Sequence, residues 1–351
     1  MTPRYLATRD DYADWFAARG EPRYRVDQVW KALHPAGTDL AEVTTLGAER
    51  RAELAVSFPR ALTPVLEQQG ERGTTRKWLL ATADGKQIET VLMLSPERAT
   101  VCVSSQAGCA MACTFCATGQ AGFDRHLDAG EIVEQVAHAA QASGRRISNV
   151  VFMGMGEPLA NYDATWRAVE RLHRDFGISA RRITVSTVGI IPGIERLAGE
   201  DLPVTLAVSL HAPNDRLRET MVPVNKRYPL REVMRAARAA AQAHGRRVTF
   251  EYACIEGVND LREHAEELAD LLAPLGPLGT HVNLIPLNRT SGFAGRAPTP
   301  EHLKRFAGYL EDLGLRPTVR RNRGTDIDAA CGQLRERATA DGSAASARLS
   351  P

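Results

Sequence analysis

SSQAGCAMACTFCATG, the stretch from Ser104 to Gly119, decides how the rest of the chain is interpreted. It places three cysteines, Cys109, Cys113 and Cys116, on one tight loop, separated by three residues and then by two. Three soft sulfur donors at this spacing suit a cubic iron–sulfur cluster. Proteins that use such a cluster only for electron transfer usually supply four cysteines. The loop therefore predicts a cluster with one iron left open to bind and activate another molecule.

A structural zinc loop is the alternative interpretation of these cysteines. Zinc takes four protein ligands, which usually arrive as two pairs separated by a dozen or more residues. The sequence contains no second pair, so Cys102 or His126 would have to complete the tetrahedron. The iron–sulfur interpretation is favoured, and zinc stays open as the weaker alternative.

The composition is that of an ordinary globular protein. The chain has 351 residues, 44% of them hydrophobic and 25% charged, which allows one catalytic domain with appendages or two domains. The N-terminus is charged throughout, and no stretch is long and apolar enough to cross a membrane. Because thiolate ligands suit a reducing compartment, we expect a cytoplasmic protein with no membrane partner. The net charge of +2 does not by itself indicate a nucleic-acid partner.

The hydrophobic pattern changes along the chain. Residues 1–60 show helical periodicity and predict a small accessory domain. Residues 61–97 alternate between apolar and polar around an Asp84-Gly85 turn, which predicts a β-hairpin module. Residues 98–325 alternate buried strands with amphipathic helices. This α/β pattern of six parallel units predicts a partial, laterally open (β/α)6 barrel.

Arginines occupy two different places in this pattern. The pairs at 145/146, 181/182 and 246/247 each precede a strand, so we expect them at the end of the barrel away from the site, in a structural role. Arg320, Arg321 and Arg323 lie at or beyond the end of the last strand, PTVRRN, and can face the site. The polar tail, residues 339–351, is expected to be disordered.

Polar residues gather at the predicted C-terminal ends of the strands, where βα barrels build their sites. The motif GMGEPL, residues 154–159, follows the second strand, and its Glu157 can accept from an ammonium group. Further strand ends carry Ser186, then Ser209, Leu210 and His211, and finally Asn288. The convergence of these groups on one face predicts a ligand site.

These motifs, together with SLHAPND, EGVND, IPLN and RGTDIDAACGQL, resemble those of the RlmN/Cfr family of radical SAM RNA methyltransferases. The resemblance covers nearly the whole chain, and the motifs keep their order. It implies a radical SAM barrel in which the three loop cysteines hold a [4Fe-4S] cluster whose open iron binds S-adenosylmethionine (SAM). It also implies a SAM site formed by Gly156, Glu157, Ser186, Ser209, Leu210, His211 and Asn288.

The resemblance implies methylation of the C2 carbon of an adenosine in large-subunit rRNA, and also in tRNA. This carbon is electron-poor and cannot attack the methyl sulfonium of SAM directly. In the family's scheme each turnover uses two SAM molecules. One methylates a cysteine, and the other is cleaved to a 5′-deoxyadenosyl radical that removes hydrogen from that methyl group, so that the carbon radical adds to the adenine.

Three residues outside the loop correspond to the family's covalent machinery. By motif, Cys331, in the C-terminal segment 326–338, carries the methyl group, Cys102 resolves the protein–RNA thioether, and Glu89 removes the C2 proton. Each has an ordinary structural explanation that the motif context outweighs. Cys254 has no counterpart and is expected in the core. If Cys102 and Cys331 meet at one carbon, they can also form an opportunistic disulfide.

The resemblance implies further partners and leaves two alternatives. It implies an electron donor such as flavodoxin, a monomeric enzyme, and a flipped adenine in immature or unfolded RNA, whose shape the N-terminal helices and hairpin would bind. The first alternative is the Cfr type, which methylates C8 and gives antibiotic resistance. The second is a zinc-stabilised RNA-binding protein without catalysis.

Overall fold

The centre of the molecule is one ten-stranded sheet. The computed structural model describes residues 1–279 and 281–334. The strand order is β1-β2-β3-β4-β7-β8-β9-β10-β11-β12, and every neighbouring pair from β4 to β12 is parallel. The parallel strands are β4 (Ala99–Cys102), β7 (Asn149–Phe152), β8 (Ile183–Thr187), β9 (Thr205–Ser209), β10 (Thr249–Cys254), β11 (His281–Pro286) and β12 (Arg316–Val319). The six predicted strands are confirmed, and β12 continues the sheet beyond β11.

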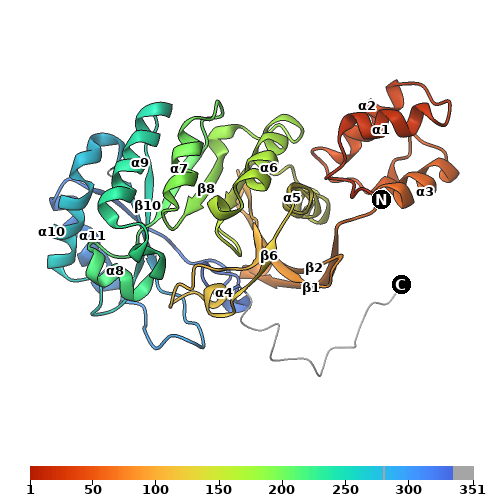
Figure 1. Ribbon diagram of the computed structural model, residues 1–351. Coiled ribbons are helices and arrows are strands. Elements are labelled where there is room, and N and C mark those ends of the chain that lie inside the picture. Colours follow the sequence, from red (N-terminus) through yellow and green to blue (C-terminus); the bar gives the residue numbers. More distant parts are fainter. Residues whose placement is uncertain (280, 335–351) are drawn as a thin grey trace.

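Amphipathic helices cover the outer face of the parallel strands (Figure 1). They bury their apolar stripes against the sheet, and all six residues of β10 are buried in return. The helices are α5 (Ala129–Ser143), α6 (Tyr162–Arg174), α7 (Ile191–Ala198), α8 (Asp215–Met221), α9 (Leu230–His244), α10 (Arg262–Leu272) and α11 (Pro300–Asp312). In the described ranges, no helix combines the length and the apolar character that a membrane span requires.

Three antiparallel strands, β1 (Leu62–Gly70), β2 (Thr75–Thr82) and β3 (Gln87–Leu94), extend the sheet beyond β4. The β2–β3 pair confirms the predicted hairpin, with Gly85 at φ 79° in its turn. The sequence did not indicate β1, because Pro64 interrupts the strand pattern. The register of β1 shifts between Pro64 and Leu66, a bulge that suits a residue without an amide hydrogen.

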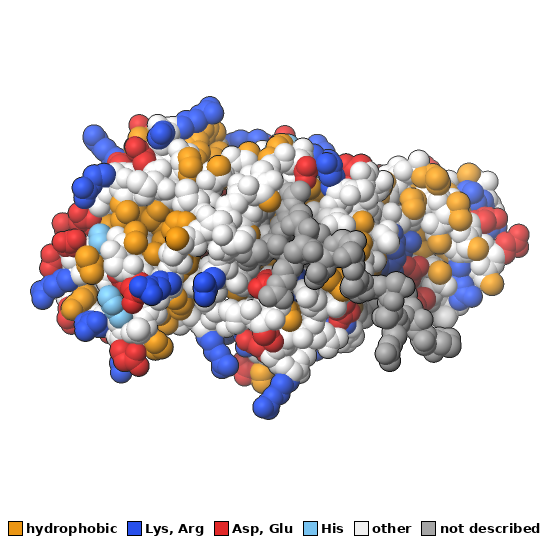
Figure 2. Space-filling view, turned by 90° about the horizontal axis from the view of Figure 1, so that it is seen from below, with side chains coloured by type: hydrophobic (Ala, Val, Ile, Leu, Met, Phe, Trp, Pro, Cys, Tyr) orange, Lys and Arg blue, Asp and Glu red, His pale blue; other side chains and the backbone are white. Residues whose placement is uncertain are grey.

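The predicted N-terminal helices are also present, as α1 (Arg9–Ala17), α2 (Tyr24–Leu33) and α3 (Ala48–Ser57). They pack against the barrel near α5 and α6. Arg171 of α6 donates to the carbonyl oxygens of Tyr5 and Ala7. A Cβ at Gly37 would lie 2.1 Å from the backbone oxygen of Ala137 in α5, so only glycine allows this approach. Acidic and basic side chains are mixed at this end of the molecule (Figure 2).

Two of the three arginine pairs at the strand starts make structural contacts. Arg145 donates to the carbonyl of Ser95 at 2.9 Å, and Arg246 donates to that of Pro203 at 2.6 Å. Both carbonyls lie at the N-terminal side of the strands, away from the predicted site. These contacts satisfy loop carbonyls that would otherwise lack a donor.

The C-terminal segment bridges the two ends of the sheet. After β12, Arg323 donates to the carbonyl of Leu94 in β3 at 2.9 Å, and the backbone oxygen of Asp328 accepts from Lys77 of β2 at 3.2 Å. This course carries residue 331 back across the open side of the barrel. The tail that the sequence predicts to be disordered, and residues 335–338 of the predicted C-terminal segment, lie outside the described residues.

Candidate active site

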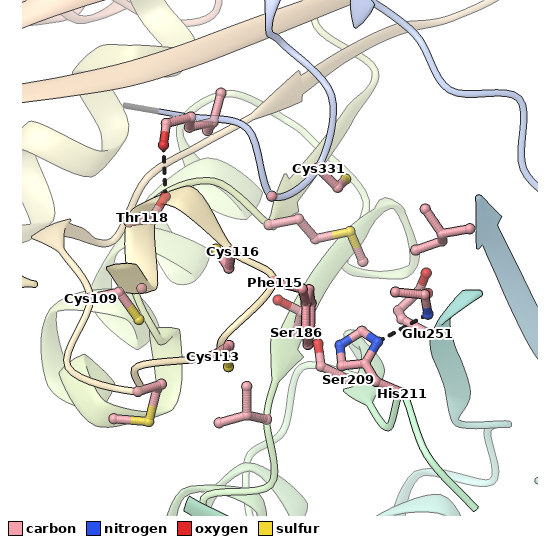
Figure 3. Close-up of a pocket in the computed structure, with 18 of the residues that line it drawn as sticks. Cys109, Cys113, Phe115, Cys116, Thr118, Ser186, Ser209, His211, Glu251 and Cys331 are labelled. Carbon is pink, nitrogen blue, oxygen red and sulfur yellow. Dashed lines mark hydrogen bonds between the residues drawn. The ribbon is translucent and has the colours of Figure 1, made fainter. Parts of the chain in front are cut away.

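A cavity of about 1070 Å³, counted with its open mouth, lies at the C-terminal ends of the parallel strands. Figure 3 shows that its labelled residues come from the cysteine loop, several strand ends and the C-terminal segment. The sequence-predicted residues that line it are Cys109, Cys113, Cys116, Gly156, Glu157, Ser186, Ser209, His211, Asn288 and Cys331. The strand-end motifs therefore converge as the βα arrangement requires.

Leu210 is the predicted SAM contact that does not line this cavity. Its side chain is fully buried in the main core, while its neighbours Ser209 and His211 line the cavity. Side chains in extended backbone alternate between two faces, so the middle residue of the three points away. Its backbone still contributes, because its carbonyl accepts from Arg218 at 3.0 Å.

The cysteine loop is held by its flanking elements, β5 (Gln106–Gly108), β6 (Phe123–His126) and α4 (Ala117–Gln120). Strands β5 and β6 pair across the loop's start. A Cβ at Gly119 would lie 2.9 Å from the backbone nitrogen of Cys113, which explains the glycine. The Ala117 amide donates to the carbonyl of Gly332 at 2.8 Å, which ties the loop to the C-terminal segment.

Burial shapes the acidity of the loop thiols. It raises the pKa of Cys109 to about 12 and raises that of Cys113 well above its usual value. Cys116 and Cys109 raise the pKa of Cys113 further, whereas the guanidinium of Arg218 lowers it. Coordination to iron would deprotonate these thiols, because a bound cation reverses the local balance of charge.

The donor set of the loop fits an iron–sulfur cluster better than zinc. Cys102 lies on the wall of a different cavity, and His126 places its Nδ1 at 3.0 Å from the side-chain nitrogen of Gln106. Neither is positioned as a fourth ligand. Among the described residues, no three His, Cys, Asp or Glu side chains converge on a single metal position. A cubic cluster instead takes three thiolates on three separate irons and leaves the fourth iron open.

Glu157 presents a buried carboxylate to the cavity. It is 2% exposed, and its oxygens accept from the amides of Val188 at 2.8 Å and Leu159 at 3.0 Å. Burial raises its pKa to about 7. Each oxygen keeps a lone pair, so the group can still accept from a ligand ammonium. Next to it, a Cβ at Gly156 would lie 2.6 Å from the side chain of Gln106.

His211 is held as a neutral donor. Its backbone has φ 62°, and its Nδ1 accepts from the amide of Ala253 at 3.1 Å. Burial, aided by Arg218, lowers its pKa to about 3. The ring therefore carries its hydrogen on Nε2. Phe115 meets the ring edge-on, with 4.8 Å between the ring centroids.

A second cavity, about 1370 Å³ with its open side, adjoins the first cavity. It contains both Cys102 and Cys331, and Cys331 lines the first cavity too. Burial raises the pKa of Cys102, and the nearby Cys331 thiol raises it further. The structure thus brings the two predicted catalytic cysteines together. Both thiols are free here.

Polar contacts fix the turn that carries Cys331. The side-chain nitrogen of Asn288 donates to the Cys331 carbonyl at 2.9 Å, and Asn322 donates to the side-chain oxygen of Asn288 at 2.6 Å. On the other side, Thr118 of α4 donates to the carbonyl of Leu334 at 3.1 Å. The turn is therefore clamped between the end of β11 and the cysteine loop.

Glu89 lies behind the wall of the second cavity. It lines neither cavity, is 4% exposed, and forms an ion pair of 3.2 Å with Lys77. It occupies the same face of β3 as Val91 and Met93, which do line the second cavity. Its carboxylate thus lies behind the strand face that borders the second cavity and does not face open space.

Two buried charges near the site were not found by sequence reasoning. Arg218 is fully buried and donates to the carbonyls of Val188, Ser209 and Leu210, which ties two strand ends together. Nothing in its helical sequence context signals burial. Glu251 lines the first cavity from β10. The sequence could have indicated Glu251, because it is a lone acidic residue in the apolar strand RVTFEYACI.

Comparison with known proteins agrees with this geometry. The radical SAM superfamily model matches residues 103–272. The crystal structure of a radical SAM methyltransferase from Sphaerobacter thermophilus is 50% identical, with a TM-score of 0.89 over 96% of this chain and all of that chain. The fold and the cysteine-lined cavity are those of a radical SAM enzyme.

Curated relatives define the family more closely. A probable dual-specificity RNA methyltransferase RlmN from Frankia casuarinae is 51% identical over 95% of this chain and 82% of its own length. The corresponding protein of Thermosynechococcus vestitus is 49% identical over 92% of this chain and 95% of its own. The chain belongs to the RlmN family of radical SAM RNA methyltransferases.

Proposed function

We propose that this protein methylates C2 of an adenosine in large-subunit rRNA and in tRNA, and that it uses two SAM molecules per turnover. One observation carries the proposal. Cys102 and Cys331 share a cavity, and that cavity meets the one lined by the cluster loop at Cys331. A group carried on Cys331 can therefore be loaded from one side and delivered on the other.

The first cavity suits the cofactors. Cys109, Cys113 and Cys116 would hold the [4Fe-4S] cluster, and a cluster bound there supplies the electron that cleaves SAM reductively. Glu157 can accept from the SAM ammonium group, and the His211 Nε2 hydrogen can be donated to an oxygen of the ligand. Hydroxyls of Ser186 and Ser209 and the amide of Asn288 complete the set of polar groups.

The second cavity suits the covalent chemistry. In the first half-reaction the Cys331 thiolate attacks the methyl carbon of one SAM, so that an S–CH₃ bond forms as the sulfonium C–S bond breaks. After the carbon has joined the adenine, the adduct would return one electron to the cluster and lose the C2 proton, and the Cys102 thiolate then attacks the Cys331 sulfur. An S–S bond forms as the bond from sulfur to the methylene breaks. The electron pair of that bond stays with the methylene carbon, which takes up a proton to become the product methyl group and so releases the base. A dithiol or an equivalent reductant must restore both thiols.

We assign the removal of the C2 proton to Glu89. Its place on the face of β3 that borders the second cavity supports this role, and Lys77 keeps the carboxylate close to the wall. Because Glu89 does not line that cavity, its side chain must rotate to reach the base.

The charge of the second cavity suits an RNA strand. Its described lining has four arginines, Arg98, Arg320, Arg321 and Arg323, and no acidic residue. Among the described residues, Arg98, Arg321 and Arg323 have no carboxylate within 4.0 Å. Phosphates pair with guanidinium groups, so we propose that the RNA backbone lies here and that the flipped adenine reaches Cys331, where the two cavities meet.

The N-terminal helices and the β1–β3 strands would bind RNA shape rather than charge, since the exposed charges at the N-terminal end are mixed (Figure 2). We further propose a monomer in the cytoplasm that receives electrons from a flavodoxin-type donor. A reducing compartment would keep the thiols free, as they are here.

Anaerobic reconstitution followed by methylation of rRNA and tRNA fragments tests the proposed function. We expect brown protein that releases 5′-deoxyadenosine and gives 2-methyladenosine on mass spectrometry of the digested RNA. Methylation at C8 would instead support the Cfr type. Colourless protein containing zinc and giving no methylation would contradict the enzyme assignment.

A further inference from the structure

Glu251 carries a buried carboxylate oxygen that the site described so far does not use. The residue is 4% exposed and projects from β10 into the first cavity (Figure 3). One oxygen, Oε1, accepts from the side-chain nitrogen of Asn283 at 2.7 Å. The other, Oε2, is buried and has no hydrogen-bond partner among the described residues. Buried polar atoms are rarely left unpaired without a functional reason.

Arg320 is the charged neighbour of this free oxygen. Its Nη1 lies 3.7 Å from Oε2, which is too far for a hydrogen bond but close enough for the two groups to face the same space. Arg320 lines both cavities, as Cys331 does. Glu251, Arg320 and Cys331 all line the first cavity, so the three groups are neighbours. An acceptor and a donor therefore stand side by side beside the methyl-carrying cysteine.

This pair is complementary to adenine. Adenine presents its 6-amino group as a donor next to a ring nitrogen that accepts, whereas a 6-oxo purine presents an acceptor at position 6. A carboxylate oxygen attracts the amino group and repels the oxo group. We propose that Glu251 Oε2 accepts from the 6-amino group of the target adenine while Arg320 donates to the neighbouring ring nitrogen. This assignment rests on the proposed function and names what selects the base.

Glu251→Gln offers a sharp test, because Asn283 fixes which end of the new side chain faces the cavity. Asn283 donates to Oε1, so the carboxamide oxygen takes that place and the carboxamide nitrogen replaces Oε2. The free atom thereby changes from an acceptor to a donor. The variant should then disfavour a 6-amino purine and tolerate a 6-oxo purine.

The experiment compares three RNA fragments that differ only at the target base, which is adenosine, purine riboside or inosine. All three bases carry hydrogen at C2. Reconstituted wild-type enzyme should bind and methylate the adenosine RNA about tenfold better than the other two, the size expected for one charge-assisted hydrogen bond. In Glu251→Gln the preference for adenosine over inosine should fall about tenfold or reverse. Glu256→Gln, a surface residue paired with Arg296, is the matched control and should keep the wild-type preference.

Two further readouts keep the outcomes distinct. Methylation of Cys331, followed by peptide mass without RNA, should still occur in Glu251→Gln, which shows that the variant is folded and binds SAM. Fluorescence anisotropy of the same RNAs measures base preference in binding, independently of methylation. An unchanged adenosine-to-inosine ratio in Glu251→Gln, or equal binding of all three RNAs by the wild type, overturns the inference. Selective binding without any methylation supports the base-reading pair and contradicts the proposed function.

Discussion

The cluster loop and the Cys102–Cys331 pair are both thiol sites, yet the chain builds them in opposite ways. The loop collects its cysteines within a few residues, and local elements such as β5 and α4 fix its shape. The pair joins the first parallel strand to the C-terminal segment, which Asn288, Asn322 and other long-range contacts hold over the barrel. The first site therefore depends on sequence spacing, whereas the second depends on tertiary packing.

The largest effect is expected from the local site. Cys113→Ser should remove the iron–sulfur absorbance and lower 5′-deoxyadenosine release by at least about a thousandfold, because two remaining thiolates do not hold a cubic cluster. Iron analysis and the visible spectrum of the anaerobically reconstituted protein measure this. Cys254→Ala is the control, since Cys254 is buried in β10 and lines neither cavity. A full iron content in Cys113→Ser would show that the loop does not bind the cluster.

Variants of the Cys102–Cys331 pair should lose a different step of the reaction. Cys331→Ala should keep its cluster and lose RNA methylation, by about a thousandfold or more, since no group remains to carry the methyl. Cys102→Ala should accept the methyl and then stall as a covalent protein–RNA adduct, visible as a shifted band on a denaturing gel. Catalytic methylation at C2 by Cys331→Ala would disprove the covalent mechanism and leave the cluster assignment intact.

Oxidation offers a test of how close the pair is. In aerobically handled protein we expect a Cys102–Cys331 disulfide, because both thiols line the second cavity. Counting thiols before and after mild reduction should then reveal two additional thiols, and Cys102→Ala should abolish the difference. Two thiols that always stay free and do not react together would argue against their meeting at one carbon.

Replacing arginines that line the second cavity should have a moderate effect on RNA binding. Arg98→Ala combined with Arg321→Ala should weaken RNA binding about tenfold and lower the slope of log K against log salt by about 1.4, as for two lost contacts to single-stranded phosphates. Arg181→Ala combined with Arg182→Ala removes an exposed pair at the opposite end of the strands and should change neither quantity. Cys331 methylation should be equal in all variants. Equal loss of RNA affinity in both double variants would contradict a specific path of the RNA backbone along the second cavity.

The same contrast explains what could be predicted from the sequence. The cluster loop, the six buried strands and the β2–β3 hairpin are encoded by spacing, apolar runs and a Asp-Gly turn, all of which are local. The alternation of side chains along a strand could also have excluded Leu210 as a SAM contact, because Leu210 lies between two residues that face the cavity. Strand β1 was missed because Pro64 breaks its pattern.

The sequence could not show which residues that are far apart along the chain lie close together in the fold. The neighbourhood of Cys102 and Cys331 followed only from family resemblance, because no periodicity links positions so far apart. Arg218 reads as a solvated helical charge, although it is fully buried among strand-end carbonyls. The unpaired oxygen of Glu251 is likewise a property of the packed barrel. Local sequence patterns locate the cysteine loop, whereas tertiary packing determines which charged side chains lie beside it.

The smallest effect should come from loosening the support of Cys331. Asn322 donates to the carbonyl of Pro286 at 2.9 Å and to the side-chain oxygen of Asn288 at 2.6 Å. Asn322→Ala should lower the free energy of unfolding by about 1–2 kcal/mol, as expected for lost hydrogen bonds that leave partly buried acceptors unpaired. Methylation of Cys331 should slow a fewfold, while iron content stays the same, because the cluster loop does not use this contact.

Urea unfolding, iron analysis and the rate of Cys331 methylation separate the two sites in this variant. Asn214→Ala is the matched control, because it also removes a side-chain amide that makes two hydrogen bonds but lies at the start of α8. It should lower stability by a similar amount without slowing Cys331 methylation. If Asn322→Ala lost iron in proportion to methylation, the two thiol sites would be one cooperative unit, and the distinction between a local and a packed site would fail.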